Sequence, residues 1–350
     1  MYKREAVDLL KKMISIPSPS GGEEAIADLM ENELKRMGFN PTRKGNNVWV
    51  CSPDWDNDKP VILLDGHLDS VGPATGWSTD PYKPTVIGDK LYGLGSNDAG
   101  GSVVALLAAF TELIKKPQPY NLIFLASAEE ENSGPGGVEL ILPELGRIDF
   151  GVVGEPTGMH AAIAEKGLFV IDCIAHGKSG HAARGEGINA IYEAMKDIRW
   201  FRKYKFERVS PLLGEVKMTV TSVNADSPHN VVPSECRFTV DIRVNDCYTN
   251  KEIFDTIRQS INSTVIPHSF SRIHSSISPD HPFIKRAIAE GRKTYSSPTT
   301  SNQCIMPFTT LKIGPGMNTR AHTANEYIKL SEIEEGIDLY IKLLDGLELN

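Results

Sequence analysis

The residues that could carry out chemistry are concentrated between Val61 and Ser102. An apolar run from Val61 to Leu64 is typical of a buried strand, and it leads directly to His67 and Asp69. Side chains two residues apart in extended backbone leave the same face, so this pair can share one site. The simplest use of the pair is a metal-bound imidazole whose orientation is helped by the neighbouring carboxylate.

A third candidate, Asp98, follows a glycine-rich turn and precedes the apolar helical run 103–113. A carboxylate at a helix start is favoured by the helix dipole and can also bridge two cations. Each of these residues alone has an ordinary explanation, as a structural histidine or a helix cap. A dinucleotide-binding loop is disfavoured, because Asp98 stands where that fingerprint has glycine and would repel a pyrophosphate. The hypothesis of a metal site therefore depends on whether further ligands lie close to His67, Asp69 and Asp98.

Composition narrows the classes of function. The chain has 350 residues, of which 40% are hydrophobic and 23% charged, as in an ordinary globular protein of one or two domains. Its net charge of -8 gives a nucleic-acid partner no electrostatic support. Without a long apolar segment or a signal-peptide core, we expect a cytoplasmic protein with no membrane partner. Five scattered cysteines without CxxC spacing argue against a disulfide framework and a thiolate zinc site.

Strands alternate with helices in the first and last parts of the chain, which predicts an α/β domain with a central, mostly parallel sheet. Its helices are expected near 7–14, 23–37, 103–113, 282–294 and 331–347, and its strands near 47–51, 61–64, 121–128, 150–153 and 308–313. A capping-box pattern at Ser20 and Glu23 marks the start of the second helix.

The middle of the chain has a different order of predicted helices and strands. Strands are expected near 168–175, 216–223 and 236–244, and helices near 187–204 and 252–266. This predicts a small α+β domain whose helices cover one face of an antiparallel sheet. We therefore predict a catalytic domain in two pieces, residues 1–167 and 278–350, with a second domain inserted at residues 168–277.

The other candidate ligands of the α/β domain also follow apolar strands, where open α/β sheets place their sites. Glu129 and Glu130 follow one strand, Glu155 follows another, and His322 follows the strand 308–313 and its glycine-rich loop. A run of three glutamates is by itself typical of a solvated loop, but its place after a buried strand and beside these partners indicates ligands. Histidine and carboxylate without sulfur suit zinc, cobalt or manganese, and can hold two ions that share a carboxylate.

Six segments carry a resemblance to a known family. They are GHLDSV around His67, GLGSNDAGGS around Asp98, ASAEEENSG around Glu130, VVGEPTG around Glu155, GKSGHAARGEGINAI around His181 and AHTANEY around His322. Along most of the chain, their order and spacing resemble the dizinc amidohydrolase and exopeptidase family of acetylornithine deacetylase, succinyl-diaminopimelate desuccinylase, aminoacylase and glutamate carboxypeptidase. The chain looks most like the acetylornithine deacetylase-like members. The resemblance implies a zinc-peptidase-like catalytic domain and an inserted, ferredoxin-like dimerisation or lid domain.

The resemblance also implies ligands for two zinc ions, which cobalt or manganese could replace. One ion would take His67, Glu155 and bridging Asp98, and the other would take Glu130, His322 and the same Asp98. Glu129 matches the family's general base, and Asp69 matches the residue beside the first ligand. A cis peptide bond is expected between Asp98 and Ala99.

The inserted domain is implied to contribute to binding. His181 would reach the site of the partner subunit in a homodimer. Asn230 and Arg243 resemble positions that contact substrate, and a guanidinium suits a carboxylate. Arg243 has an equally good explanation as a structural ion-pair residue.

These residues suit the hydrolysis of an amide. Two zinc ions lower the pKa of water and polarise the carbonyl, while a free carboxylate carries the proton to the leaving amine. If Glu130 is used as a ligand, its neighbour Glu129 is left free for that task. A tetrahedral oxyanion needs a further donor, for which His181 is the candidate.

For the substrate, the segment SPTTSNQC resembles biosynthetic deacylases that act on acyl-ornithine or acyl-lysine. The family commonly has Thr-Ser-Asp there, so Asn302 is a departure that we expect to alter the acyl pocket. The leading hypothesis is hydrolysis of N-acetyl- or N-succinyl-ornithine in arginine biosynthesis. The alternatives are a succinyl-diaminopimelate desuccinylase, an acyl-lysine deacylase, and a dipeptidase or carboxypeptidase. A serine or cysteine hydrolase is disfavoured, because there is no G-x-S-x-G motif and Cys304 has no catalytic signature around it.

Overall fold

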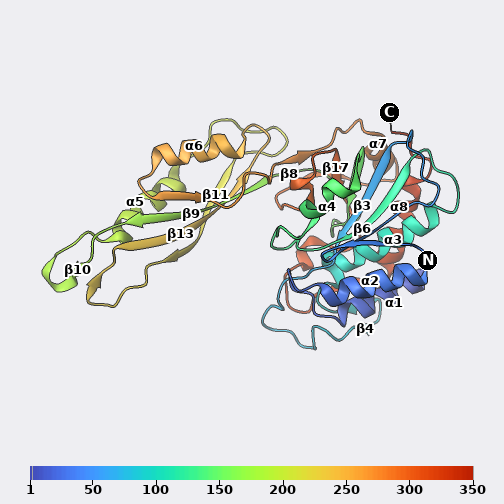
Figure 1. The fold of residues 1–350 in the computed structure, drawn as a ribbon, viewed down its shortest axis with the longest axis horizontal. Coiled ribbons are helices and arrows are strands. Elements are labelled where there is room, and N and C mark those ends of the chain that lie inside the picture. The colour runs from blue at the N-terminus through green and yellow to red at the C-terminus, as the bar shows by residue number, and fades with distance from the viewer. Residues whose placement is uncertain (2, 350) are drawn as a thin grey trace. The chain divides into compact units, whose positions relative to one another are not determined.

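The computed structural model describes residue 1 and residues 3–349, and it divides into two compact units (Figure 1). The first unit comprises Met1–Ile163, Ser276–Tyr295 and Ser301–Asn350, apart from the two residues left undescribed. The second comprises Ala164–Ser275 together with the short segment Ser296–Thr300. The chain thus enters the second unit a few residues before the predicted boundary, and the segment 296–300 joins a unit to which the sequence did not assign it.

The main sheet has the strand order β1-β2-β6-β3-β7-β17-β8-β15, with β16 paired to β8. These strands are β1 (Thr42–Lys44), β2 (Asn47–Cys51), β3 (Val61–His67), β6 (Asn121–Ser127), β7 (Phe150–Val153), β8 (Ala161–Glu165), β15 (Ser275–Ser276), β16 (Thr294–Ser297) and β17 (Thr310–Lys312). Strands β6, β3, β7 and β17 are parallel neighbours, and antiparallel strands flank them. This arrangement confirms the predicted α/β class with a central, mostly parallel sheet.

Helices cover both faces of this sheet, which explains why its central strands are apolar without interruption. Ile62 and Leu64 of β3 join the largest core, whereas Val61 and Leu63 join a second core on the opposite face. The largest core draws on α1 (Lys3–Ile14), α2 (Glu24–Arg36), α3 (Gly101–Leu113), α7 (Pro282–Ala289) and α8 (Leu330–Leu344). The second core draws on α4 (Val138–Leu145), which the sequence did not predict.

A separate, small three-stranded sheet links distant parts of the first unit. It consists of β4 (Thr85–Ile87), β5 (Lys90–Tyr92) and β18 (Tyr327–Lys329), with β5 in the middle. Because β18 follows the loop that carries His322 and β5 precedes the turn that carries Asp98, this pairing brings the two ligand segments together.

The second unit is a four-stranded antiparallel sheet with two helices. Its strands β9 (Gly167–His176), β11 (Lys217–Asn224), β13 (Glu235–Val244) and β14 (Thr264–Pro267) have the order β11-β13-β9-β14. The helices are α5 (Ala190–Lys203) and α6 (Asn250–Ser260) (Figure 1). Their apolar residues share one core with alternate residues of β9 and β13. This βαββαβ order confirms the ferredoxin-like prediction. A small hairpin pairs β10 (Gly180–His181) with β12 (Val231–Val232).

Three local predictions were wrong. The helix predicted at 282–294 ends at Ala289, and Thr294 begins β16. The helix predicted at 252–266 ends at Ser260, and residues 264–267 form β14. Asp197 of α5 accepts hydrogen bonds from the backbone N–H groups of Asn262 and Ser263, which stabilises the turn into the strand. The capping box before α2 is absent, because the Glu23 side chain is buried and its Oε1 accepts hydrogen bonds from Gly21 N and Glu129 N.

None of the described helices is both long and apolar enough to span a bilayer.

Candidate metal centre

The candidate ligands meet at the carboxyl ends of four neighbouring parallel strands. His67 ends β3, the three glutamates follow β6, Glu155 follows β7, and His322 lies in the loop after β17. Since parallel strands end at the same edge of the sheet, residues from four distant segments become neighbours there.

His67 is held in the tautomer that a metal ligand needs. Its side chain is 2% exposed, and its Nδ1 is 2.9 Å from the backbone carbonyl of Asp69, to which it donates a hydrogen bond. The other ring nitrogen, Nε2, is buried without a hydrogen-bond partner and lies 3.4 Å from Asp98 Oδ1. Burial acts to lower the pKa of His67, but the nearby carboxylates of Asp69 and Asp98 raise it well above the usual value. The buried Nε2 lies opposite the Asp98 carboxylate, where a cation would fit between them.

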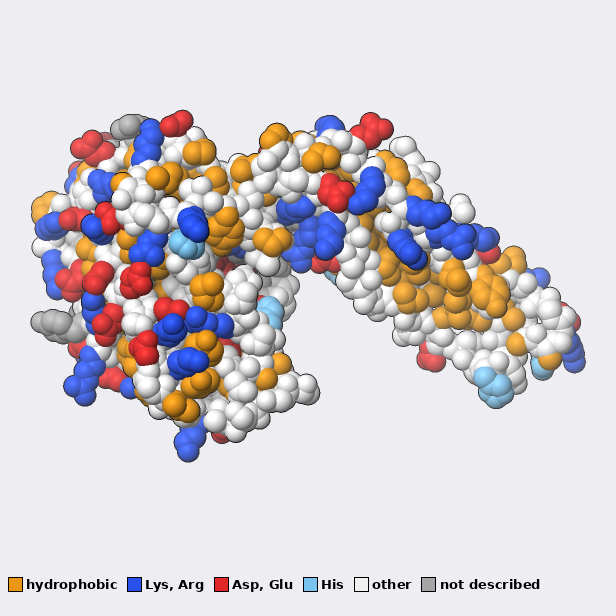
Figure 2. Space-filling model, turned by 180° about the vertical axis from the view of Figure 1, so that it is seen from behind, with side chains coloured by type: hydrophobic (Ala, Val, Ile, Leu, Met, Phe, Trp, Pro, Cys, Tyr) orange, Lys and Arg blue, Asp and Glu red, His pale blue; other side chains and the backbone are white. Residues whose placement is uncertain are grey.

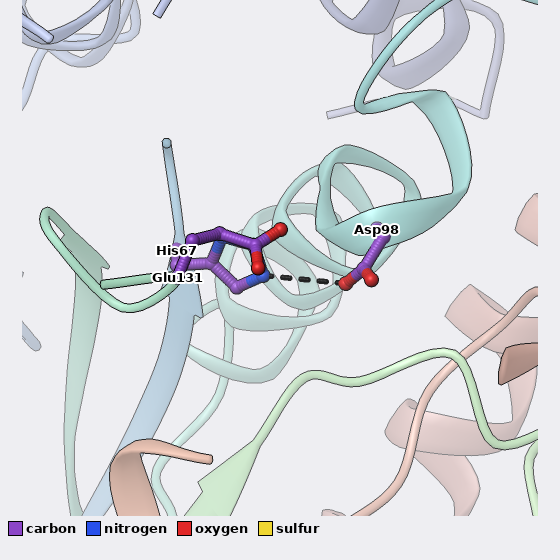
Figure 3. A group of neighbouring side chains, drawn as sticks. All are labelled: His67, Asp98 and Glu131. Atoms are coloured by element: carbon purple, nitrogen blue, oxygen red, sulfur yellow. Dashed lines mark ion pairs between the residues drawn. The ribbon is translucent and has the colours of Figure 1, made fainter. Parts of the chain in front are cut away.

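Two groups of residues each bring three potential ligand atoms close enough together to bind one ion. The atoms of His67, Asp98 and Glu131 are within 4.8 Å of one another, as are those of His67, Glu130 and Glu155. Figure 3 shows the first group, in which the Asp98 carboxylate approaches the His67 ring from the turn before α3. The peptide bond between Asp98 and Ala99 is cis, as expected.

His322 reaches the same place through Glu131. Its Nε2 is 3.0 and 3.1 Å from the two carboxylate oxygens of Glu131, and 3.6 Å from Asp98 Oδ2. The hydrogen bond to Glu131 raises the pKa of His322 to about 9, although partial burial acts in the opposite direction. The His322 imidazole and the carboxylates of Glu131 and Asp98 thus form a group of three potential metal ligands.

The structure corrects the expected order of the three acids. The carboxylate that contacts His322 belongs to Glu131, not to Glu130. Glu129 does not join the group, because its backbone has a φ of 52°, which turns the chain and directs the side chain to a neighbouring turn. There Glu129 Oε2 accepts a hydrogen bond of 2.9 Å from the backbone N–H of Gly136. In this structure Glu129 therefore lies apart from the group in which the resemblance placed it.

Two glycines make room for the Glu129 carboxylate. A Cβ at Gly134 would lie 1.8 Å from Glu129 Oε2, and a Cβ at Gly136 would lie 2.3 Å from Oε1. A side chain at either position would require the Glu129 carboxylate to move. These glycines in the segment ENSGPGG were the sequence signal for the turned glutamate, but they are informative only once the left-handed backbone at Glu129 is known.

The acidic loop is held by two buried carboxylates. Asp69 Oδ1 accepts a hydrogen bond from Glu130 N, and Asp69 Oδ2 accepts one from Glu131 N, each at 3.0 Å. Ser20 Oγ donates a further hydrogen bond of 2.7 Å to Asp69 Oδ2. The N–H of Glu129 is bound by Glu23 at 3.1 Å. Asp69 therefore orients both His67 and the acids opposite it.

The remaining acids lie in a strongly negative and buried environment. Burial and the neighbouring Asp98 raise the pKa of Glu155 to about 8. Burial also raises the pKa of Glu130 well above the usual value, with further contributions from Glu155 and Glu131. Carboxylates are seldom gathered in this way unless a cation compensates them. Together with the unpartnered Nε2 of His67, this donor set fits divalent cations bound by nitrogen and oxygen, such as zinc, cobalt or manganese.

The other predicted residues lie in the second unit. His181 is exposed, and its Nδ1 accepts a hydrogen bond from Ala183 N. Asn230 is also exposed, in the turn before β12, and its backbone carbonyl accepts a hydrogen bond from Ala182 N. The structure thus brings His181 and Asn230 into one hairpin region, but it does not test their contact with substrate.

Arg243 is committed to neighbours within the second unit. Its Nε and Nη2 donate to the two carboxylate oxygens of Asp241, at 2.8 and 2.9 Å, and Nη1 donates to Thr300 Oγ1 at 2.8 Å. This arrangement agrees with the explanation of Arg243 as a structural ion-pair residue, and its contact with substrate stays a prediction.

Asn302 is buried within the first unit. Its Nδ2 donates to Asp65 Oδ2 at 3.0 Å and to Ser127 Oγ at 3.1 Å. Both amide hydrogens are therefore bound by residues of β3 and β6. An aspartate at this position would face the Asp65 carboxylate. The amide at residue 302 is therefore complementary to the Asp65 carboxylate.

Comparison with known proteins agrees with this architecture. Residues 63–346 match the model of peptidase family M20/M25/M40. A succinyl-diaminopimelate desuccinylase of Orientia tsutsugamushi is 26% identical, over 98% of this chain and 96% of its own length. An acetylornithine deacetylase of Proteus mirabilis is also 26% identical, over 97% and 96% of the two chains.

Solved structures share the fold over the full length. An M20 family metallo-carboxypeptidase of Sulfolobus solfataricus superposes with a TM-score of 0.78 at 17% identity, covering 97% of this chain and 98% of the other. The YXEP protein of Bacillus subtilis, described as a dinuclear metal-binding peptidase of the M20 family, has a TM-score of 0.73 at 12% identity, with 98% and 97% covered.

Proposed function

The chain belongs to peptidase family M20/M25/M40 and is a metal-dependent amidohydrolase, and from this premise we propose that it hydrolyses the N-acyl amide of an acylated amino acid. The observation that carries the proposal is the convergence of two imidazoles and four carboxylates at one edge of the parallel sheet. Buried carboxylates gathered without a cation destabilise a fold, whereas imidazole and carboxylate groups in this arrangement suit a divalent cation.

Two ions would divide the ligands between them, with Asp98 common to both sets. One ion would be held by His67, Asp98 and Glu155, and the other by Asp98, Glu131 and His322. The contacts of His322 with Glu131 and Asp98, and of His67 with Asp98, support this division. Bound divalent ions supply Lewis acidity, which acidifies water and polarises an amide carbonyl.

Glu130 is the residue that is left to move the proton. It lies within reach of His67 and Glu155, its backbone is fixed by Asp69, and its carboxylate is not the one paired with His322. Its carboxylate would accept a proton from water and deliver it to the leaving nitrogen. This role replaces the one that the resemblance implied for Glu129.

For the substrate, we propose N-acetyl- or N-succinyl-ornithine, in arginine biosynthesis. The similarity to an acetylornithine deacetylase supports this choice, and the equal similarity to a succinyl-diaminopimelate desuccinylase supports that compound as the second candidate. Both substrates pair an acyl amide with a free amino-acid carboxylate, for which Arg243 or Asn230 of the second unit would be the partner.

A kinetic comparison tests the proposal. Protein stripped of metal and reconstituted with zinc or cobalt would be assayed on N-acetyl-ornithine, N-succinyl-ornithine, N-succinyl-diaminopimelate and a dipeptide. We expect kcat/KM to be highest for one ornithine compound. Preference for the diaminopimelate compound would support the second candidate. Turnover of the dipeptide alone would refute the acyl-amino-acid proposal, but it would still agree with a metal-dependent hydrolase.

We also propose a homodimer formed through the second unit. Ile188, just before α5, and Tyr192 and Met195 of α5 are 52%, 65% and 52% exposed. Figure 2 shows a patch of hydrophobic side chains on this unit, with lysine and arginine side chains around it. Among the described strands, β11 pairs with β13 alone, which leaves an edge that a second copy could extend.

The dimer can be tested by its mass and by mixing variants. Tyr192→Glu combined with Met195→Glu is expected to yield monomers in sedimentation velocity. If His181 serves the partner's site, mixing His181→Ala with Glu130→Gln should recover part of the activity that each lacks. No recovery in a mixture that forms dimers would contradict the shared site.

A further inference from the structure

We propose that Glu326 is a positioning residue that, together with Asn97, locks the turn carrying Asp98 to the loop carrying His322. The proposal rests on the metal-dependent function proposed above. It assigns to a residue outside the ligand set the task of fixing the spacing between two ligands of one ion.

The Glu326 carboxylate binds the backbone of the Asp98 turn. Its Oε1 accepts hydrogen bonds from Asn97 N at 2.8 Å and Asp98 N at 3.0 Å, and its Oε2 accepts one from Gly95 N at 3.2 Å. Glu326 is 2% exposed and Asn97 is fully buried, whereas Gly95 and Asp98 are partly buried. Three amide donors are thus satisfied by one side chain that lies more than 200 residues away in sequence.

Asn97 makes the reverse connection. Its Oδ1 accepts a hydrogen bond of 2.9 Å from Met317 N, and its Nδ2 donates one of 3.1 Å to Met317 O. Asn97 is fully buried, and a Cβ at Gly316 would lie 2.5 Å from its Oδ1. The loop that carries His322 is therefore tied to the Asp98 turn at both ends, through Met317 and through Glu326.

The backbone continues the same connection. Gly93 N donates to Glu326 O at 3.1 Å, and beyond it β5 pairs with β18. With its two ends joined in this way, the His322 loop cannot shift relative to Asp98 without breaking several buried hydrogen bonds. A rigid spacing of this kind is what a shared cation requires of its ligands.

Stability alone does not explain a carboxylate at this position. Glu326 lies close to Asp98, in a region that already contains Glu130, Glu131 and Glu155, and each added buried negative charge is unfavourable. An ionised carboxylate offers two oxygens that can receive three N–H donors, whereas a glutamine offers one oxygen and turns an N–H group towards a backbone donor.

The test compares Glu326→Gln with Glu334→Gln, a matched change at an exposed glutamate of α8. Metal-free proteins would be titrated with zinc by calorimetry and with cobalt by visible absorption. We expect Glu326→Gln to weaken binding of at least one ion by about 10- to 100-fold and to change the cobalt spectrum. Its kcat should fall while KM changes little, and Glu334→Gln should behave as the parent protein.

A purely structural role would give another result. If Glu326→Gln unfolds at a lower temperature but binds both ions with the parent affinity and spectrum, the proposal is overturned. If Glu326→Gln does not fold, Glu326→Asp and Asn97→Ala replace it, because each keeps part of the connection. Metal binding that is unchanged in both of these variants would equally overturn the proposal.

The metal titrations need no substrate. If the parent protein binds two ions but cleaves none of the acyl compounds, the proposed substrate fails while the role of Glu326 is still measured. Weakened metal binding in Glu326→Gln with normal binding in Glu334→Gln would support the proposal in either case.

Discussion

Three adjacent glutamates have three different environments in this protein. Glu131 contacts His322, Glu130 lies among His67 and Glu155, and Glu129 is turned away onto the backbone of Gly136. The difference comes from one left-handed residue at the end of β6. At the scale of single residues, chemical type therefore says less about role than the direction in which the backbone points each side chain.

Replacing each glutamate by glutamine separates the roles. We expect Glu130→Gln to keep both metal ions and to lose about 10²- to 10⁴-fold in kcat, because the proton carrier is removed. Glu131→Gln should lose metal. Glu129→Gln should keep most of its activity, since an amide oxygen can still accept from Gly136. Metal analysis and steady-state kinetics of the three variants distinguish these roles. An inactive Glu129→Gln that still binds metal would support Glu129 as the general base, as the resemblance implied.

Asn302 offers a second test at this scale. Asn302→Asp would place a buried carboxylate against Asp65 Oδ2, which Asn302 Nδ2 now contacts at 3.0 Å. We expect a loss of roughly 3 kcal/mol in the free energy of unfolding near neutral pH. Burial raises the pKa of Asp65 to about 6, so the loss should be smaller at pH 5, where protonation supplies a donor again. The exchanged pair Asp65→Asn with Asn302→Asp is the control and should recover part of the stability.

At the scale of elements, the strands deliver the ligands and buried carboxylates hold the loops that follow. Asp69 binds the N–H groups of Glu130 and Glu131, Glu23 binds that of Glu129, and Glu326 binds the turn before α3. Loops that carry catalytic residues are usually mobile, and charge-assisted hydrogen bonds to their backbones are one way to order them.

Asp69→Asn should loosen the acidic loop, because the amide replaces one acceptor with a donor that faces a backbone N–H. We expect weaker metal binding, a fall of about 10-fold or more in kcat, and a loss of about 1 to 2 kcal/mol in the free energy of unfolding. Denaturant unfolding and metal titration measure these effects. Asp89→Asn, at an exposed position that binds Ser331, is the control. Wild-type metal affinity in Asp69→Asn would contradict a positioning role.

At the scale of the whole molecule, the metal centre makes stability depend on pH. In the metal-free protein, burial raises the pKa of Glu155 to about 8 and that of Glu326 to about 7, and the hydrogen bond to Glu131 raises the pKa of His322 to about 9. The unfolded chain titrates these groups near 4 for the acids and near 6.5 for histidine. The folded, metal-free chain therefore holds extra protons between about pH 4 and 9, and it loses their stabilising effect as the pH rises.

We expect the free energy of unfolding of the metal-free protein to fall between pH 5 and 9, by about 1.4 kcal/mol per pH unit for each extra proton. Saturating zinc should suppress this fall, because the ions take the place of the protons, so that stabilisation by metal increases with pH. Denaturant unfolding with a chelator and with zinc measures both curves. A metal-free profile that is flat over this range would show that these groups do not hold excess protons.

The sequence by itself indicated the class of the fold, an inserted α+β unit and four ligand candidates of the proposed centre, which are His67, Asp98, Glu155 and His322. It could do so because apolar periodicity marks buried strands, and because parallel strands bring the residues that follow them to a common edge. Only the tertiary structure decided which glutamate contacts His322, what Asn302 faces and what Glu326 holds. Those outcomes depend on a left-handed backbone at Glu129 and on hydrogen bonds between segments far apart in the chain, which local sequence patterns do not encode.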